Sequence, residues 1–134
     1  MADGNKFDLK IITPDRVFYE GEASMVEFNT TEGEIGVYKE HVPMTVIIAP
    51  GILTITEEEG QKIAALHAGF VEILQEKVTI MAEIIEWPDE IDLSRAEEAR
   101  DRAEQRLAEK SPDLDVKRAE IALRRAMARI DIAK

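Results

Sequence analysis

Arginines recur at a fixed spacing in the last third of this 134-residue chain, and their chemistry is that of anion binding. Two trios each follow steps of seven and four: Arg95, Arg102 and Arg106, then Arg118, Arg125 and Arg129. On a helix, such steps place each trio along one face, where like charges repel. Either neighbouring acids or a bound anion must offset that repulsion.

The ordinary alternative is a solvated helix face held by ion pairs along the helix. Glu98 precedes Arg102 by four residues, and Glu120 precedes Arg124 by four. Glutamate placed four residues before arginine is the favourable order for such pairs. Spacing by itself leaves both interpretations open.

The arginines require two helices, and the sequence supplies signals for both. Alternation stops at Trp87-Pro88-Asp89, which we interpret as a connection between modules. Asp92 can cap the first helix, and Ser94 with Glu97 offers a competing capping box. The segment from Lys110 to Asp115, with its serine, proline and aspartates, indicates a turn and a new cap. Two helices of about 17 residues each would then form an antiparallel hairpin.

Small residues dominate the faces along which these helices should meet. The expected seam of the first helix is Leu93, Ala96, Ala99, Ala103 and Leu107, and that of the second is Val116, Ala119, Leu123, Ala126, Met127 and Ile130. Alanine buries little area, so pairing at roughly 25 cal/mol per Å² is weak. We expect a hairpin that depends on docking to another surface and is able to open.

The N-terminal part has the pattern of a β-sandwich. Phe7, Leu9 and Ile11 alternate with polar residues, as do Val26 and Phe28, which is the period of half-buried strands. Turn signals recur about every 8 to 12 residues. The predicted fold is therefore α+β, an N-terminal antiparallel β-sandwich followed by a C-terminal antiparallel two-helix hairpin.

Composition excludes several classes of function. The formal net charge of −11 argues against nucleic-acid binding, yet residues 1–90 carry 6 Lys and Arg against 18 Asp and Glu, while residues 91–134 carry 11 against 10. The chain has no cysteine, which excludes disulfides and thiolate metal sites and favours a reducing compartment. No stretch approaches the ~20 apolar residues of a membrane span, so we expect a soluble or peripheral protein.

No catalytic constellation is visible. His41 and His67 are the only histidines, and we interpret both as structural, hydrogen-bonded residues. The acids form no metal-binding motif, so no metal site and no enzyme activity are expected. Near the glycine turn, Tyr38, Val42, Pro43 and Met44 could serve either as core or as a docking patch.

Four longer sequence segments are specific enough to point to one protein family. "GEIGVYKEHVP", "HAGFVEILQEKVTIMA", "IDLSRA" and "KRAEIALRRAMARI" occur in this order over nearly the whole chain. Together they resemble the epsilon subunit of bacterial F-type ATP synthases, the counterpart of chloroplast epsilon and mitochondrial delta. The sequence differs from the usual family sequence at Lys39-Glu40 and at Trp87-Pro88. We expect Trp87-Pro88 to stiffen the linker.

The resemblance implies a non-catalytic subunit of the rotor central stalk that couples proton translocation to ATP synthesis. Residues 1–86 would be a sandwich docked on the gamma subunit and the proteolipid c-ring, residues 87–90 a linker, and residues 91–134 a regulatory hairpin. In this family the hairpin switches between a compact form and an extended form that reaches the alpha and beta subunits and inhibits ATP hydrolysis. Such a subunit would lie at the cytoplasmic face of the cell membrane as a peripheral protein.

The resemblance also implies a regulatory ligand, ATP, which stabilises the compact form. "IDLSRA" matches a nucleotide-binding motif known in some members. The positions that align with that site are Glu86, Ile91, Asp92, Arg95, Ala96, Arg102, Arg125 and Arg129. No cofactor is required, and participation of Mg²⁺ is left open. No phosphate-binding P-loop is present, so binding without turnover is expected.

Two other interpretations stay open from the sequence. The chain could be a purely structural coupling subunit without nucleotide sensing. It could also be an unrelated acidic sandwich that binds carbohydrate or peptide.

Overall fold

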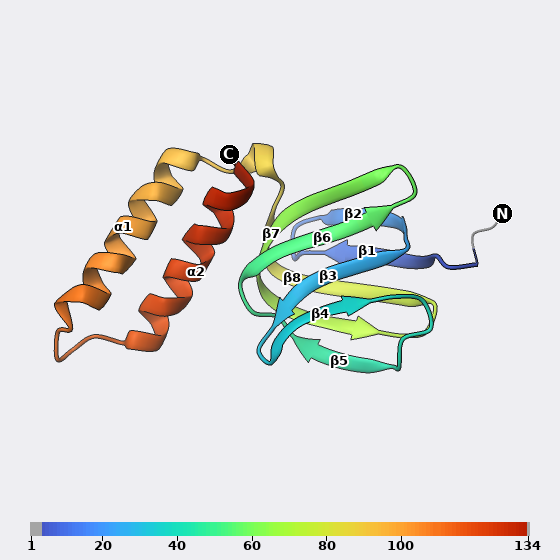
Figure 1. Ribbon diagram of the computed structural model, residues 1–134, viewed down its shortest axis with the longest axis horizontal. Coiled ribbons are helices and arrows are strands. Elements are labelled where there is room, and N and C mark those ends of the chain that lie inside the picture. The colour runs from blue at the N-terminus through green and yellow to red at the C-terminus, as the bar shows by residue number, and fades with distance from the viewer. Residues whose placement is uncertain (1–3, 134) are drawn as a thin grey trace.

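The computed structural model describes residues 4–133, in which a β-sandwich is followed by two helices (Figure 1). The strands are β1 (Phe7–Ile12), β2 (Val17–Ala23), β3 (Met25–Thr30), β4 (Gly33–Val37), β5 (Met44–Ile47), β6 (Gly51–Glu57), β7 (Gly60–Ile73) and β8 (Lys77–Glu86). A short 3-10 turn, η1 (Pro88–Glu90), leads into α1 (Leu93–Glu109) and α2 (Val116–Ala133). The expected α+β fold is confirmed. The outermost residues of the two predicted domains, 1–3 and 134, lie outside the described residues.

One continuous hydrogen-bonded sheet wraps around to make both layers of the sandwich. Its strand order is β2-β1-β8-β7-β6-β3-β4, and β5 pairs with β7. All neighbours are antiparallel except β1 and β8, which are parallel. The sheet is therefore not wholly antiparallel, because β1 pairs antiparallel with β2 on one side and parallel with β8 on the other.

The long strand β7 belongs to both layers because it bends at its centre. Its first half pairs with β6 and its second half with β5, and the register against β8 shifts on either side of Ala68. Gly69 has a φ of +132°, and a Cβ there would lie 2.1 Å from the carbonyl oxygen of Met81. Only glycine fits this bulge.

The core follows the alternation seen in the sequence. Phe7, Leu9 and Ile11 are buried on one side of β1, and Val26 and Phe28 are buried on β3. They belong to one hydrophobic cluster that fills the space between the layers. The sandwich therefore has its own core, independent of the helices.

Both helices begin at the aspartates that the sequence offered. The Asp92 carboxylate accepts a hydrogen bond from the Arg95 backbone N–H at 3.2 Å, so Asp92 caps α1. At α2, the Asp115 carboxylate accepts from the Arg118 N–H at 3.0 Å. Lys110 ends α1 in the left-handed conformation, with φ 51°. The capping box from Ser94 to Glu97 is not used as the helix start.

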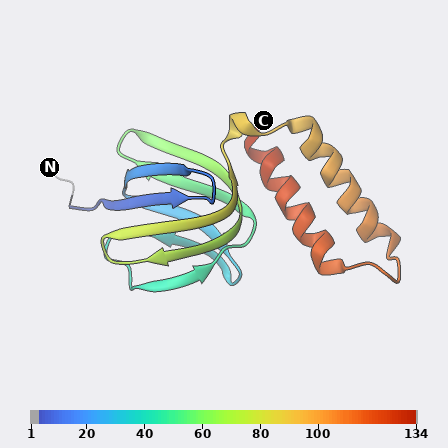
Figure 2. The same cartoon turned by 180° about the vertical axis from the view of Figure 1, so that it is seen from behind.

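The two helices pair through alanines, as expected, and α2 lies between α1 and the sandwich (Figures 1 and 2). Ala96 and Ala103 on α1 are buried, as are Ala119 and Ala126 on α2. Contact areas between methyl groups are small, so this seam contributes little apolar burial.

The predicted face of α2 was wrong at two positions. Val116 and Met127 are exposed, at 51% and 42%. The helix instead turns Ala128 and Ile132 toward the sandwich, where they form a small cluster with Ala65. Ile52 and Ile91 pack against that cluster. The apolar part of hairpin docking is thus a minor contact, separate from the main core.

We predict that Ile132→Ala weakens docking of α2 on the sandwich. Removing a buried isoleucine side chain costs about 2 kcal/mol or more. The control is Ile121→Ala on the same helix, because Ile121 is already 37% exposed. Spin labels at Glu120 and Glu34 would report longer, broader distances for Ile132→Ala only. Identical distance distributions in the two variants would contradict the docking role of Ile132.

Candidate functional site

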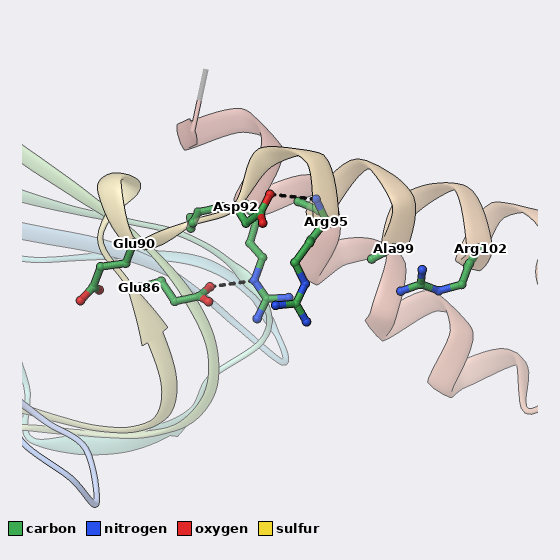
Figure 3. A pocket seen from close by; sticks show the side chains of 9 residues that line it. Glu86, Glu90, Asp92, Arg95, Ala99 and Arg102 are labelled. Atoms are coloured by element: carbon green, nitrogen blue, oxygen red, sulfur yellow. Dashed lines mark hydrogen bonds and ion pairs between the residues drawn. The ribbon is translucent and has the colours of Figure 1, made fainter.

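A cavity of about 320 Å³ opens where the end of β8, η1 and the two helices meet (Figure 3). Its lining consists of Glu86, Glu90, Ile91, Asp92, Arg95, Ala96, Ala99, Arg102 and Arg129. We call this the arginine cavity. Seven of the eight residues predicted from the sequence line it, although they come from three elements and a linker. Arg125 is the predicted residue that does not.

Helix geometry explains how α1 contributes to the cavity. Arg95, Ala99 and Arg102 follow steps of four and three, which places them on one face. Figure 3 shows the side chain of Arg102 directed along the helix toward Arg95. Ala99 lies between the two arginines and leaves space because it has only a methyl group. Sequence reasoning assigned Ala99 to the helix seam, although the same spacing could have identified it as cavity lining.

Glu86 is the acid that joins the sandwich to α2. Its Oε1 accepts a hydrogen bond from Arg129 Nε at 2.7 Å and lies 3.0 Å from His67 Nε2. Burial alone would raise the pKa of the Glu86 carboxyl, but the hydrogen bonds with His67 and Arg129 outweigh burial and hold that pKa below its ordinary value. Glu86 is therefore an ionised anchor for Arg129 at neutral pH.

Sequence reasoning missed the partner role of His67. The side chain is buried, with 1% of the residue exposed, as a structural histidine should be. Its contact with Glu86 depends on the bulge in β7, which no local pattern in the sequence reveals. The position carries no motif that would have marked it.

A second group of contacts fixes the linker to the sandwich. Arg16 Nη2 donates to both carboxylate oxygens of Glu90, at 3.0 and 2.8 Å. Glu90 also accepts from the Trp87 backbone N–H at 2.9 Å. The rings of Trp87 and Phe18 stack, with centroids 4.2 Å apart. These contacts supply a physical basis for a stiff linker at Trp87-Pro88. Glu90 was also missed as cavity lining.

The charges in the arginine cavity are unevenly neutralised. Each lining acid already has a partner: Glu86 holds Arg129, Glu90 holds Arg16, and Asp92 caps α1. Within residues 4–133, the side chains of Arg95 and Arg102 form no ion pair with them. The arrangement suits a polyanion with several phosphate groups, because guanidiniums from two helices converge on one space.

Arg125 lies on α2 beside this arrangement rather than in the lining. Its Nε is buried without a hydrogen-bond partner among the described residues. Its charge acts on His67, whose pKa it helps to lower. The described residues gather no group of three acidic or histidine side chains suited to a metal ion.

The fold and the cavity define a protein in which a β-sandwich carries a helical hairpin, with an arginine-lined cavity at their junction. Two family profiles together cover residues 6–134. The first, described as ATP synthase, Delta/Epsilon chain, beta-sandwich domain, matches residues 6–88, and the second, the long alpha-helix domain of the same chain, matches residues 89–134. The chain belongs to the ATP synthase delta/epsilon chain family.

Individual relatives agree over nearly their whole length. The ATP synthase epsilon chain of Shouchella clausii is 44% identical, covering 94% of this chain and 93% of that protein. The epsilon chain of Caldanaerobacter subterraneus subsp. tengcongensis is 42% identical, covering 95% and 93%. The family resemblance expected from the sequence is thereby confirmed.

Two solved assemblies contain chains of the same fold. In the Euglena gracilis mitochondrial ATP synthase OSCP/F1/c-ring structure, the similar chain has a TM-score of 0.80 and 27% identity, covering 98% of this chain and 85% of that chain. In the Tetrahymena thermophila mitochondrial ATP synthase central stalk and c-ring, the TM-score is 0.54 at 15% identity, which shows the fold alone. Neither described helix of this chain is long and apolar enough to cross a membrane.

Proposed function

We propose that this chain is a non-catalytic epsilon subunit of the central stalk of an F-type ATP synthase, coupling proton translocation to ATP synthesis. The observation that carries the proposal is the family match, which runs through both the sandwich and the hairpin. The similar chain from Euglena gracilis comes from an F1/c-ring assembly, which supports the same place in the enzyme. The chain would act at the cytoplasmic face of the cell membrane as a peripheral protein.

A row of apolar side chains on the outer face of the sandwich suits docking on the gamma subunit. The row follows cross-strand partners through five strands: Ile47, Phe70, Met81, Ile12 and Val17. We call it the apolar stripe. Ile47, Phe70 and Val17 are 62%, 43% and 54% exposed. Contiguous exposed apolar surface of this kind is typical of a protein interface.

A separate loop patch would meet the proteolipid ring. Tyr38 and Val42 are exposed, and Met44, at the start of β5, is partly so. This exposure favours docking over core packing for the residues beside the glycine turn. The two surfaces would let the sandwich, residues 1–86, contact both partners at once.

The arginine cavity would bind ATP as a regulatory ligand. Arg95 and Arg102 would meet the phosphates from α1 and Arg129 from α2, so the nucleotide would hold the helices together. Ile91, Asp92 and Ala96, at the start of α1, would contact the nucleoside, and Glu86 would orient Arg129. Arg125, which does not line the cavity, would contribute to ATP binding through its positive charge. Titrating ATP with and without Mg²⁺ would show whether the ion accompanies the phosphates.

The hairpin, residues 91–134, would inhibit ATP hydrolysis when it leaves the sandwich and extends toward the alpha and beta subunits. Support comes from the small contact that Ala128 and Ile132 make with the sandwich. A compact form held by so little apolar area lies within a few kcal/mol of alternatives. Residues 87–90 would be the linker that stays attached to the sandwich, and the hairpin would move beyond it.

For the nucleotide proposal, we expect Arg95→Ala and Arg129→Ala each to weaken ATP binding at least about tenfold. Each removes charge-assisted hydrogen bonds of about 1.5–3 kcal/mol, and 1.4 kcal/mol is tenfold in affinity. Calorimetric titration of the purified chain measures this. The matched control is Arg106→Ala, on α1 but outside the lining. Unchanged binding in both variants would remove these arginines from the site, and no binding by the unaltered chain at millimolar ATP would favour the purely structural coupling subunit.

For the docking proposal, we expect Phe70→Glu to weaken association with an assembled alpha-beta-gamma complex at least tenfold. A charge at the centre of an apolar interface must be desolvated, and central aromatic residues carry much of the binding energy. Ile63→Glu is the control, because Ile63 is on the same strand but in the half paired with β6 and is similarly exposed. Equal affinity of the two variants would place the gamma contact elsewhere.

For the inhibitory proposal, we expect deletion of residues 91–134 to raise ATP hydrolysis by the assembled enzyme. The sandwich retains its own core and its stripe, so assembly should persist. Hydrolysis rates of enzyme reconstituted with the full and shortened chains provide the measurement. Equal rates would mean that the hairpin does not inhibit ATP hydrolysis in this enzyme.

A further inference from the structure

The bulge in β7 places a buried histidine directly behind the arginine cavity. In the pairing of β7 with β8, Leu66 faces Ile85 and Ala68 faces Ile84, so His67 is the extra residue between them. Bulges re-aim the side chain of the inserted residue. His67 Nε2 comes within 3.0 Å of Glu86 Oε1 as a result.

Glu86 connects His67 to α2. The same oxygen, Oε1, accepts from Arg129 Nε at 2.7 Å. Because Glu86 engages Nε, the two terminal nitrogens of the Arg129 guanidinium are left for a ligand in the cavity. Three side chains from β7, β8 and α2 thus form one chain of contacts that ends at the cavity wall. We call it the His67–Glu86–Arg129 relay.

The surroundings of His67 favour its neutral form. The groups that face it are Glu86 from β8 and Arg125 and Arg129 from α2. Burial is the largest cause that lowers the pKa of His67, and the charges of both arginines add to it, while Glu86 opposes them. Nδ1 is buried and has no hydrogen-bond partner among residues 4–133. A proton on Nδ1 would therefore be an unsatisfied donor beside two cations.

We propose that His67 is a positioning residue of the arginine cavity: as a neutral Nε2–H donor it fixes Glu86 and thereby Arg129, and proton uptake by His67 releases α2 and weakens nucleotide binding. This inference rests on the proposed nucleotide-sensing function. It adds a pH-dependent control to that site, because docking of the hairpin and the charge on His67 are linked.

The direction of the pH effect follows from linkage. The docked form has the lower pKa at His67, so the undocked form binds more protons. Docking is therefore fully favoured above the ordinary histidine pKa of about 6.5 and is lost as pH falls through the lowered value. The pKa of Glu86 is also lowered on docking, but it acts in the more acidic range of carboxylates, around 4. Between pH 7.5 and 6.0 the effect belongs to His67.

The first test compares ATP affinity by calorimetry at pH 7.5 and 6.0 in the full chain and in His67→Gln. Glutamine can donate an N–H to Glu86 but cannot take up a proton. Relative to His67→Gln, we expect the unaltered chain to lose up to about fourfold more affinity, the ratio set by protonation of a histidine with a pKa of about 6.5. The titration of ATP itself cancels in this ratio. Identical pH profiles would overturn the proposal.

Two further variants separate positioning from general structural effects. His41→Gln is the matched control, because His41 is a half-buried histidine outside the cavity, with Nδ1 2.8 Å from the Val42 carbonyl oxygen, and this variant should follow the pH profile of the unaltered chain. His67→Ala removes the donor and should bind ATP more weakly at both pH values, with partial rescue in His67→Gln. Equal affinities for the alanine and glutamine variants would mean that the hydrogen bond to Glu86 does not position the site.

The second test needs no nucleotide and keeps the two proposals distinguishable. NMR of His67 should show the Nε2–H tautomer, uncharged at pH 7.5 and taking up a proton only as the hairpin undocks. Labels on α2 and the sandwich should move apart as the pH falls from 7.5 to 6.0. If ATP fails to bind but these results are obtained, the nucleotide proposal fails, whereas the inference that His67 keeps α2 docked is supported. If His67 takes up its proton between pH 7.5 and 6.0 and the labels do not move, the inference fails even where ATP binds.

Discussion

The carboxylate of Glu86 is where the sandwich meets the hairpin, and the compact arrangement of the helices depends on it. Glu86 ends the last strand, and its Oε1 contacts both Arg129 on α2 and His67 on β7. A half-buried ion pair of this kind gains from the lower local dielectric, but removing either partner leaves a charge without compensation. Its importance is therefore positional: it fixes which face of α2 meets the strands and where the Arg129 guanidinium lies.

The rest of the contact between hairpin and sandwich is small by comparison with the sandwich core. Ala128 and Ile132 form a separate cluster with Ala65, whereas the interior of the sandwich is a continuous set of larger side chains. A fully buried isoleucine contributes roughly 1.5–3 kcal/mol, so the apolar docking energy is of the same order as one good polar contact. The core of the sandwich can thus remain folded without the hairpin contact. This division of stability between the two parts is what a movable regulatory element requires.

Local signals in the sequence were enough for the elements but not for the way they pack. Alternation at Phe7, Leu9 and Ile11 identified a buried strand face, and Asp92 marked the start of α1, because both depend on neighbouring residues alone. The face of α2 was mispredicted at Val116 and Met127, since alanines on several sides of that helix permit more than one buried stripe. The spacing of the cavity arginines gave their common face, yet the part played by His67 depends on a register shift between two strands. A bulge is a property of strand pairing, and no single segment encodes it.

In the proposed function, nucleotide binding and hairpin docking would influence each other to the same extent, whichever is considered first. A ligand at about 100 times its dissociation constant stabilises the state it binds by about 2.7 kcal/mol. That amount is close to the apolar contribution of Ile132 and to the strength of a charge-assisted contact such as that of Arg129 with Glu86. If docking were stronger by several times this amount, the hairpin would stay closed at any nucleotide concentration, and the cavity could report nothing. The small alanine seam and the minor apolar cluster therefore suit the proposed regulation, in which a phosphate chain contacted from both helices would set the position of the hairpin.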